Sequence, residues 1–360
     1  MDAAGFVTQL LEQAIDEGAS DIHIEPQVEE LRIRQRVDGF LVLLNQIERH
    51  HMYPIISRIK VMAHLDIGEK RLPQDGAMTV IHKGERIDIR VSTMPTLHGE
   101  KVVLRLLRNR PELITLSELG IGETELTRLK RLMLRRNGLI IATGPTGAGK
   151  TTTLYAILKE LNSIEQNIVT LEDPIEVQLP GLTQIQIHPK AGLTFAHGLR
   201  AVLRQDPNII MVGEIRDQET AEIAVRAALT GHLVLSTLHT IDSCSAITRL
   251  IDMGVAPFLV ASALKGVIAQ RLIRLICKEC DGAGCKECNQ TGYQGRTGVF
   301  EILVVDEQLE RLIVEGTSLN QLREITQKAG MRTLAEAIKE KVEQKKTTQQ
   351  EYFRVVNELV

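Results

Sequence analysis

The chain has 360 residues, of which 43% are hydrophobic and 25% are charged, and its formal net charge is −3. This length can form two domains, and this composition excludes a disordered chain and is typical of a soluble globular protein. The net charge gives no bulk signal for nucleic acid. With tryptophan absent and phenylalanine and tyrosine few, no aromatic and basic platform is visible, so we expect no direct nucleic-acid contact.

The lack of a signal peptide or membrane span in the sequence, together with the spacing of the cysteines, predicts a cytoplasmic protein. The N-terminus carries acidic residues and lacks the basic stretch and apolar core of a signal peptide. The uncharged apolar stretch Met253–Leu264 is shorter than the roughly 20 residues that span a bilayer. Four of the five cysteines lie within twelve residues, which favours a metal site in a reducing compartment over a disulfide framework.

The first part of the chain, residues 1–107, predicts a small α+β domain in which strands face one layer of helix. Asp38-Gly39 and Lys83-Gly84 are turn signals between strands that alternate in polarity. The predicted elements are a helix that ends near Gly18, a strand over 20–26, hairpins over 31–44 and 78–92, a helix over 50–64 and a strand over 101–107.

Residues 108–122 contain Pro111 and show no periodicity, which predicts a linker. The second domain, residues 123–360, alternates strands and helices, and this order predicts a mostly parallel sheet with nucleotide at the carboxyl ends of its strands. After Arg271 we expect a cysteine knuckle and then roughly three helices. The predicted strands are 139–143, 167–171, 208–212 and 233–238, and the helices are 126–134, 151–161, 195–203 and 220–229.

The second domain contains a phosphate-binding loop, in the stretch LIIATGPTGAGKTTT at residues 139–153. A buried-strand pattern precedes the G-x-x-x-x-G-K-[ST] motif and a helical pattern follows it, so a chance glycine-rich turn is the weaker interpretation. Backbone N–H groups would surround phosphate oxygens, Lys150 would reach the β- and γ-phosphates, and Thr151 would offer its hydroxyl to Mg²⁺. The predicted nucleotide-binding residues are Gly144, Pro145, Thr146, Gly147, Ala148, Gly149, Lys150, Thr151 and Thr152.

Carboxylates follow two of the predicted strands. Glu214 lies two residues after the apolar run at 208–212, where a base that orients water is needed; the alternative is a surface carboxylate. Gly213 stands where a metal-binding aspartate is usual, so metal contact there would run through water. Glu172 and Glu176 lie close together after an earlier strand, near Mg²⁺ or an activated water, although Asp-Pro between them is also a plain turn.

Histidines and arginines complete the candidates. His232 and His239 flank the strand at 233–238, and each could donate to a γ-phosphate or could be structural. An arginine from a neighbouring part commonly meets the charge on a transferred phosphoryl group. The candidate arginines, which are otherwise ordinary surface cations, are Arg90, Arg105, Arg200 and Arg204.

Several motifs in fixed order resemble the secretion ATPases that power type II secretion, type IV pili and competence pseudopili. The resemblance covers nearly the whole chain and implies a RecA-like P-loop domain after a smaller, PAS-like α+β domain, in subunits that form a hexameric ring. The motifs are SDIHIEP (20–26), RLPQDG (71–76), RVST-P-LHGE (90–100), GPTGAGKTTTLY (144–155), LEDPIE (171–176), LRQDPNIIMVGEIRD (203–217), ALTGHLVLSTLHT (228–240) and GRTG (295–298).

The resemblance also assigns roles by matching positions. Lys150 and Thr151 would bind ATP and Mg²⁺, and Glu214 would be the catalytic glutamate. The acidic box would be Glu172 and Glu176, the histidine box His232 and His239, and the phosphate-facing arginines Arg90, Arg105, Arg200 and Arg204.

Two C-x-x-C pairs, Cys277/Cys280 and Cys285/Cys288, predict a closed tetrahedral zinc site; free or redox-active thiols are the alternative. Only four residues separate the pairs, so the loop must fold back sharply, which Gly282 and Gly284 would permit. In the family that this chain resembles, assembly motors carry such an element and retraction motors generally lack it. Cys244 stands apart and is predicted to be a small buried residue.

We therefore predict a cytoplasmic Mg²⁺-dependent ATPase at the inner face of the cell membrane, which drives an inner-membrane platform protein that assembles pilin-like subunits. Its compact form with a zinc knuckle most resembles a competence pseudopilus motor. A type II secretion ATPase and a retraction motor are alternatives within the family. A nucleotide-binding scaffold without sustained turnover is the alternative from another class.

Overall fold

The computed structural model describes residues 2–108 and 115–357, and the chain forms two compact units, Met1–Pro111 and Glu112–Val360. The predicted linker at 108–122 lies partly outside the described residues. Leu116 and Leu119, from its described part, are buried in a core of the second unit. No helix within the two described ranges is both long and apolar enough to cross a bilayer.

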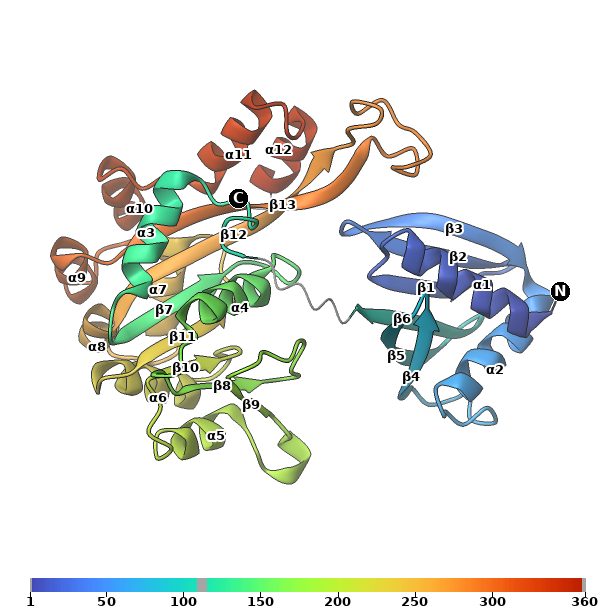
Figure 1. The fold of residues 1–360 in the computed structure, drawn as a ribbon, viewed down its shortest axis with the longest axis horizontal. Coiled ribbons are helices and arrows are strands. Elements are labelled where there is room, and N and C mark those ends of the chain that lie inside the picture. Colours follow the sequence, from blue (N-terminus) through green and yellow to red (C-terminus); the bar gives the residue numbers. More distant parts are fainter. Residues whose placement is uncertain (1, 109–114, 358–360) are drawn as a thin grey trace. The chain divides into compact units, whose positions relative to one another are not determined.

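The first unit is a six-stranded antiparallel sheet with two helices packed on one face, α1 (Ala3–Asp16) and α2 (Met52–Met62), as Figure 1 shows. The sheet order is β3-β2-β1-β6-β5-β4, and a short 3-10 turn, Arg49–His51, precedes α2. This arrangement confirms the predicted α+β class. The strands are β1 (Asp21–Pro26), β2 (Glu30–Val37), β3 (Phe40–Glu48), β4 (Gln74–His82), β5 (Glu85–Thr96) and β6 (Gly99–Arg108).

Side chains of β1 alternate between the two faces of the sheet, and the helices cover the face that carries the apolar ones. Ile22 and Ile24 are fully buried in the core beneath α1 and α2, whereas His23 between them belongs to the opposite face. Both predicted hairpin turns are present. Asp38 and Gly39 have φ of 49° and 90°, and Lys83 and Gly84 have φ of 50° and 83°, the left-handed pair that a two-residue turn between twisted strands requires.

The second unit is a seven-stranded sheet in the order β13-β12-β7-β11-β10-β8-β9, in which every neighbouring pair is parallel except β12 with β13. The sheet confirms the predicted parallel α/β domain. The strands are β7 (Gly138–Thr143), β8 (Ile168–Glu172), β9 (Thr183–Gln186), β10 (Ile209–Val212), β11 (Leu233–Leu238), β12 (Leu264–Ile276) and β13 (Tyr293–Val304).

Helices bury both faces of this sheet. Leu139 and Ile141 of β7 face the core formed with α5, α6, α7 and α8, and Ile140 and Ala142 face the core formed with α3 and α4. The helices are α3 (Glu123–Met133), α4 (Lys150–Leu161), α5 (Phe195–Val202), α6 (Gln218–Leu229), α7 (Ser243–Asp252), α8 (Pro257–Ala263), α9 (Glu307–Val314), α10 (Leu319–Lys328), α11 (Leu334–Glu343) and α12 (Gln349–Asn357), with a 3-10 turn at Pro189–Ala191.

The sequence analysis missed two long strands of this unit. β12 joins the sheet beside β7 and β13 pairs with β12, and the cysteines lie in the loop between these two strands (Figure 1). The described part of the tail has four helices, α9 to α12, where roughly three were expected. Short apolar runs fit a buried strand and a buried helix equally well, which is why periodicity alone missed β12.

Candidate active site

The phosphate loop connects β7 to α4, as predicted, and its glycines have backbone conformations that other residues rarely adopt. Gly147 and Gly149 have φ of 79° and 86°, in the left-handed region that favours glycine. Gly144 has φ of 150°, and a Cβ there would lie 2.6 Å from the carbonyl oxygen of Gln270. The loop can therefore close at the start of α4 only because these positions carry no side chain.

Lys150 is buried against its own loop. Its Nζ donates to the carbonyl oxygens of Gly144 at 2.8 Å and Pro145 at 3.0 Å. Burial lowers the pKa of Lys150 to about 8, and the nearby charge of Glu214 opposes this shift. Two backbone carbonyls are weak partners for an ammonium group, so a phosphate that entered the loop would be a stronger one.

Glu214 follows β10 at the same edge of the sheet as the phosphate loop. One strand, β11, separates β10 from β7, so the two strand ends are roughly 10 Å apart at about 4.8 Å per strand. The side chain of Glu214 is 15% exposed; its Oε2 lies 2.7 Å from Nε of Arg216 and 3.9 Å from Nε2 of His239. A carboxylate with this placement can hold or accept a proton beside a phosphate in the loop.

The two predicted histidines lie at opposite ends of β11. His239 follows the strand at the edge of Glu214, and burial lowers its pKa, with the charge of Lys150 adding to the shift. His232 precedes the strand, and its Nδ1 lies 3.0 Å from the carbonyl oxygen of Ala227. Of the two predicted histidines, the structure therefore brings only His239 to the edge of the sheet that carries the phosphate loop.

The two residues predicted to form an acidic box differ in environment. Glu172 is 2% exposed and accepts hydrogen bonds from the hydroxyl of Tyr155 in α4, from Oγ1 of Thr170 at 2.5 Å and from Nε2 of Gln184 at 3.0 Å. Glu176 is exposed. The contacts of Glu172 hold β8, β9 and α4 together, which is a positioning role for the helix that begins at the loop.

The four candidate arginines form two pairs. Arg90 and Arg105 are directly opposite one another on β5 and β6 in the first unit, and Nε of Arg105 donates to Asp21 at 3.0 Å. Arg200 in α5 pairs with Glu219 at 2.5 Å, and Arg204 donates to the carbonyl oxygen of Arg200 at 2.8 Å. Each pair presents two cations on one surface of its own unit.

The four clustered cysteines converge as a zinc site requires. Their sulfur atoms all lie within 4.8 Å of one another, and three pairs are 3.7–3.9 Å apart. A tetrahedron with Zn–S bonds of about 2.3 Å has sulfur separations of about 3.8 Å, so the set fits Zn²⁺. Backbone N–H groups of Gly284 and Gly292 point at the sulfurs of Cys280 and Cys288, at 3.3 and 3.2 Å, which favours thiolates.

The short gap between the two pairs is closed by left-handed residues. Gly282 and Gly284 have φ of 85° and 93°, as the sequence predicted, and Asp281 shares this conformation with φ of 49°. A Cβ on Gly292 would lie 2.4 Å from the carbonyl oxygen of Gly282. Cys244 is fully buried, and burial raises its pKa to about 11, which confirms its assignment as a small core residue.

Sequence reasoning missed two residues beside the loop, Gln270 and Arg271, which lie just beyond the part of β12 that pairs with β7. Nε2 of Gln270 donates to the carbonyl oxygen of Ala148 at 2.6 Å. The guanidinium of Arg271 donates to the carbonyl oxygens of Gln270 at 2.9 Å and Ile241 at 2.6 Å. Only the recognition of β12 as a strand next to β7 would have pointed to them.

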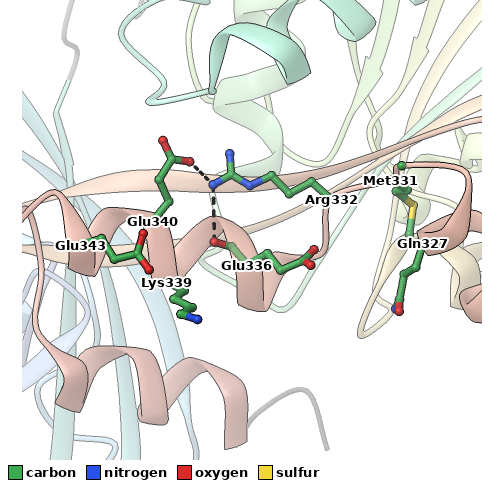
Figure 2. A pocket seen from close by; sticks show the side chains of 8 residues that line it. Gln327, Met331, Arg332, Glu336, Lys339, Glu340 and Glu343 are labelled. Carbon is green, nitrogen blue, oxygen red and sulfur yellow. Dashed lines mark hydrogen bonds and ion pairs between the residues drawn. The ribbon is translucent and has the colours of Figure 1, made fainter.

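A separate pocket of about 500 Å³ lies where α10 leads into α11, and none of the predicted site residues lines it. Figure 2 shows Arg332 across it, in contact with Glu336 and Glu340. Arg332 also lies 3.6 Å from the buried Glu125 of α3. These ion pairs join α3 to α11, so the pocket belongs to the packing of the C-terminal helices.

The model of the family described as "Type II/IV secretion system protein" matches residues 3–354 of this chain. The chain belongs to this family. The match extends over both units and includes the phosphate loop, Glu214 and the four cysteines. It confirms the family that the motifs indicated.

Curated relatives from this family include secretion and pilus proteins. The chain is 51% identical to the type II secretion system protein HxcR of Pseudomonas aeruginosa, over 98% of this chain and 77% of that one. It is 47% identical to the type II secretion system ATPase E of Vibrio cholerae, over 98% of this chain and 75% of that one. For the type IV pilus assembly ATPase PilB of Thermus thermophilus, the identity is 44% over 93% of this chain and 41% of PilB.

Solved structures show the same architecture. The Legionella pneumophila ATPase DotB aligns with a TM-score of 0.76 at 25% identity, over 98% of this chain and 95% of DotB. The pilus retraction motor PilT with bound ADP aligns with a TM-score of 0.67 at 26% identity, over 96% of each chain. The secretion-ATPase fold is thus shared across both units.

Proposed function

We propose that this chain is the ATP-hydrolysing motor subunit of a type II secretion or type IV pilus-like assembly apparatus. The observation that carries the proposal is that the phosphate loop and Glu214 lie at one edge of a parallel sheet, with a single strand between them. A phosphate loop alone binds nucleotide, whereas turnover also requires a residue that orients the attacking water or accepts its proton beside the γ-phosphate, and a carboxylate can do both. The names of the relatives as ATPases support this assignment.

In this proposal the loop 144–152 holds the phosphates of ATP through the backbone N–H groups of its residues other than Pro145 and through the start of α4. Nζ of Lys150 moves from the carbonyl oxygens of Gly144 and Pro145 to the β- and γ-phosphates. Mg²⁺ would neutralise phosphate charge, and the half-exposed Thr151 at the first turn of α4 would hold it through its hydroxyl. The donor set of hydroxyl, carboxylate and water suits a hard cation such as Mg²⁺.

Glu214 is the proposed general base. In the structure its Oε2 forms an ion pair with Arg216. With ATP bound, the Glu214 carboxylate would orient the attacking water and accept its proton. Nε2 of His239 lies 3.9 Å from this carboxylate, and we propose that His239 also contacts the γ-phosphate when ATP is bound. Glu172 would act through α4 by its bond to Tyr155, and we assign Glu176 and His232 to the acidic and histidine boxes on the family resemblance alone.

We further propose a homohexameric ring in which Arg90, Arg105, Arg200 and Arg204 meet phosphate charge. An arginine supplied by a neighbouring part is a common solution for phosphoryl transfer. The pairing of Arg90 with Arg105 across β5 and β6 supports a joint role, because the two cations lie on the same face. Domain movement on hydrolysis would then be passed to the apparatus.

The zinc knuckle is proposed to be structural. Four cysteine ligands leave no open position on the metal, so the site stabilises the loop between β12 and β13. In this family a four-cysteine element favours an assembly motor over a retraction motor. We place the motor in the cytoplasm at the inner face of the cell membrane, bound to an inner-membrane platform protein and without direct nucleic-acid contact.

The remaining part of the proposal concerns which apparatus the motor drives. The relatives described above are named for type II secretion and pilus assembly, and these support a secretion pseudopilus or a pilus as the product. A competence pseudopilus stays a prediction. Deleting the gene and scoring pilus formation, exoprotein secretion and DNA uptake separately would assign the product, since each apparatus affects a different readout.

Steady-state ATPase activity of the purified protein tests the motor assignment. Glu214→Gln should keep ATP binding and lose about 100-fold or more of the activity, because proton acceptance is removed. Lys150→Ala should lose both ATP binding and ATPase activity. Glu324→Gln and Lys328→Ala, which remove an exposed ion pair on α10, are matched controls and should leave both readouts unchanged. Equal phosphate release by all five proteins would favour the scaffold.

A further inference from the structure

The phosphate loop lies against β12, a strand that no motif assigns to nucleotide binding. Ala269 of β12 is paired with Thr143, the last residue of β7. One residue further along each strand, the chains separate: β7 enters the loop, whereas β12 continues past it as Gln270 and Arg271. The backbone and side chain of Gln270 therefore form the wall of the loop on this side.

Gln270 contacts both ends of the loop. Its Nε2 donates to the carbonyl oxygen of Ala148 at 2.6 Å. A Cβ on Gly149 would lie 3.0 Å from the same nitrogen, and a Cβ on Gly144 would lie 2.6 Å from the Gln270 carbonyl oxygen. Gln270 is 1% exposed, so water cannot replace this hydrogen bond.

The bond to Ala148 fixes the orientation of one peptide group. In a trans peptide the C=O and N–H of the same unit point in opposite directions. The carbonyl of Ala148 is directed at Gln270, so the N–H of Gly149 is directed away from β12. That N–H belongs to the glycine that precedes Lys150, where a phosphate-binding loop uses backbone N–H groups as donors.

The backbone of Gln270 is itself held. The guanidinium of Arg271 donates to the carbonyl oxygen of Gln270 and to that of Ile241, which follows β11. Arg271 is 3% exposed. The support of the loop therefore extends from β12 to the segment that begins at His239, beside Glu214.

We propose that Gln270 is a positioning residue for nucleotide binding, which holds the Ala148–Gly149 peptide so that its N–H faces the phosphates. The inference rests on the proposed ATPase function and adds a residue to it. Gln270 does not touch the nucleotide and acts through the loop backbone. Without its amide donor the peptide can rotate, and the loop must be reordered whenever phosphate binds.

The test compares Gln270→Met with wild type in a titration of a fluorescent ATP analogue in the presence of Mg²⁺. Methionine keeps the length and volume but cannot donate to Ala148. The dissociation constant should rise about tenfold, because the peptide that has lost its hydrogen bond must be reordered when phosphate binds. In turnover, KM should rise more than kcat falls, because the chemistry of Glu214 is untouched.

Gln35→Met is the matched control. Gln35 in β2 is also 1% exposed, donates one hydrogen bond through Nε2 to Glu17, and has an Oε1 without a partner among the described residues, as Gln270 does. It should lower the thermal midpoint without changing nucleotide affinity. Gln270→Asn, whose amide is one methylene too short to reach, is the second variant if Gln270→Met does not fold.

The outcomes separate the two proposals. A folded Gln270→Met or Gln270→Asn that binds the analogue within twofold of wild type overturns the inference and leaves the ATPase assignment intact. The same holds if both the Gln270 and Gln35 variants lower the thermal midpoint and neither changes affinity. A wild-type protein without saturable binding of the analogue would overturn both proposals.

Discussion

The hydroxyl of Tyr155 in α4 donates a hydrogen bond to the carboxylate of Glu172 at the end of β8. Burial, together with this carboxylate, raises the pKa of Tyr155, so the phenol stays protonated and remains a donor. The same carboxylate accepts from Thr170 and Gln184. Glu172 thus holds the helix that starts at Lys150 against the end of β8.

We expect Tyr155→Phe to destabilise the second unit by about 1–3 kcal/mol, because one oxygen of the buried Glu172 loses its donor. Thermal unfolding monitored by circular dichroism measures this change. Tyr352→Phe is the control: Tyr352 packs beside a small core of the same unit, and no partner for its hydroxyl is found among the described residues. Equal midpoints for the two variants would contradict the role of the Tyr155 hydroxyl.

The first unit contains a buried ion pair between Lys60 of α2 and Glu100 of β6, which are 1% and 7% exposed. Lys60→Met should cost about 3–5 kcal/mol, because a buried carboxylate is left without its cation. The double variant Lys60→Met/Glu100→Met should recover most of this loss. Urea unfolding of the single and double variants gives the coupling free energy between the two side chains. If the losses in the free energy of unfolding simply add, the two charges are independent.

Glu351 of α12 joins the C-terminal helix to β12. It is fully buried and accepts from Arg274 at 2.7 and 3.0 Å and from Arg354 at 2.6 and 2.9 Å. Burial alone would raise the pKa of Glu351, but the hydrogen bonds from Arg354 and Arg274 bring it below the ordinary 4.5. Glu351→Gln should cost about 3 kcal/mol at pH 7, since two guanidinium groups lose their counter-charge.

The lowered pKa of Glu351 sets the pH dependence of this loss. The carboxylate contributes its full stability above about pH 4.5, and the contribution disappears as the pH falls through the native pKa. The gap in thermal midpoint between wild type and Glu351→Gln should therefore be constant from pH 7 to about pH 5 and narrow below it. A gap that widens in acid would exclude this carboxylate as the cause.

Metal analysis should find about one equivalent of zinc per chain. A chelator should release it and make four thiols reactive toward a thiol reagent, whereas Cys244 should stay protected, since it is fully buried and its pKa is raised to about 11. Cys288→Ser should lower the metal content, and Cys244→Ser, the matched control, should not. Four reactive thiols in untreated wild type would instead indicate free cysteines.

How much of the site the sequence predicted depends on whether its residues are neighbours in the chain. Gly144, Gly149 and Lys150 belong to one short loop, and their spacing alone predicted the phosphate loop. A strand, a turn with left-handed glycines and a helix start are local structures, so a short stretch of sequence determines them. The turns at Asp38-Gly39 and Lys83-Gly84 followed in the same way. Strands that alternate with helices likewise determined a parallel sheet.

The tertiary structure alone decided which of these elements are neighbours. Gln270 reaches Ala148 across 122 positions of the chain, and no local pattern encodes that β12 joins the sheet beside β7. The same limit explains why His232 and His239 look equivalent in sequence yet lie at opposite ends of one strand. Periodicity records which face of an element is buried, whereas strand order follows from how all the faces pack together.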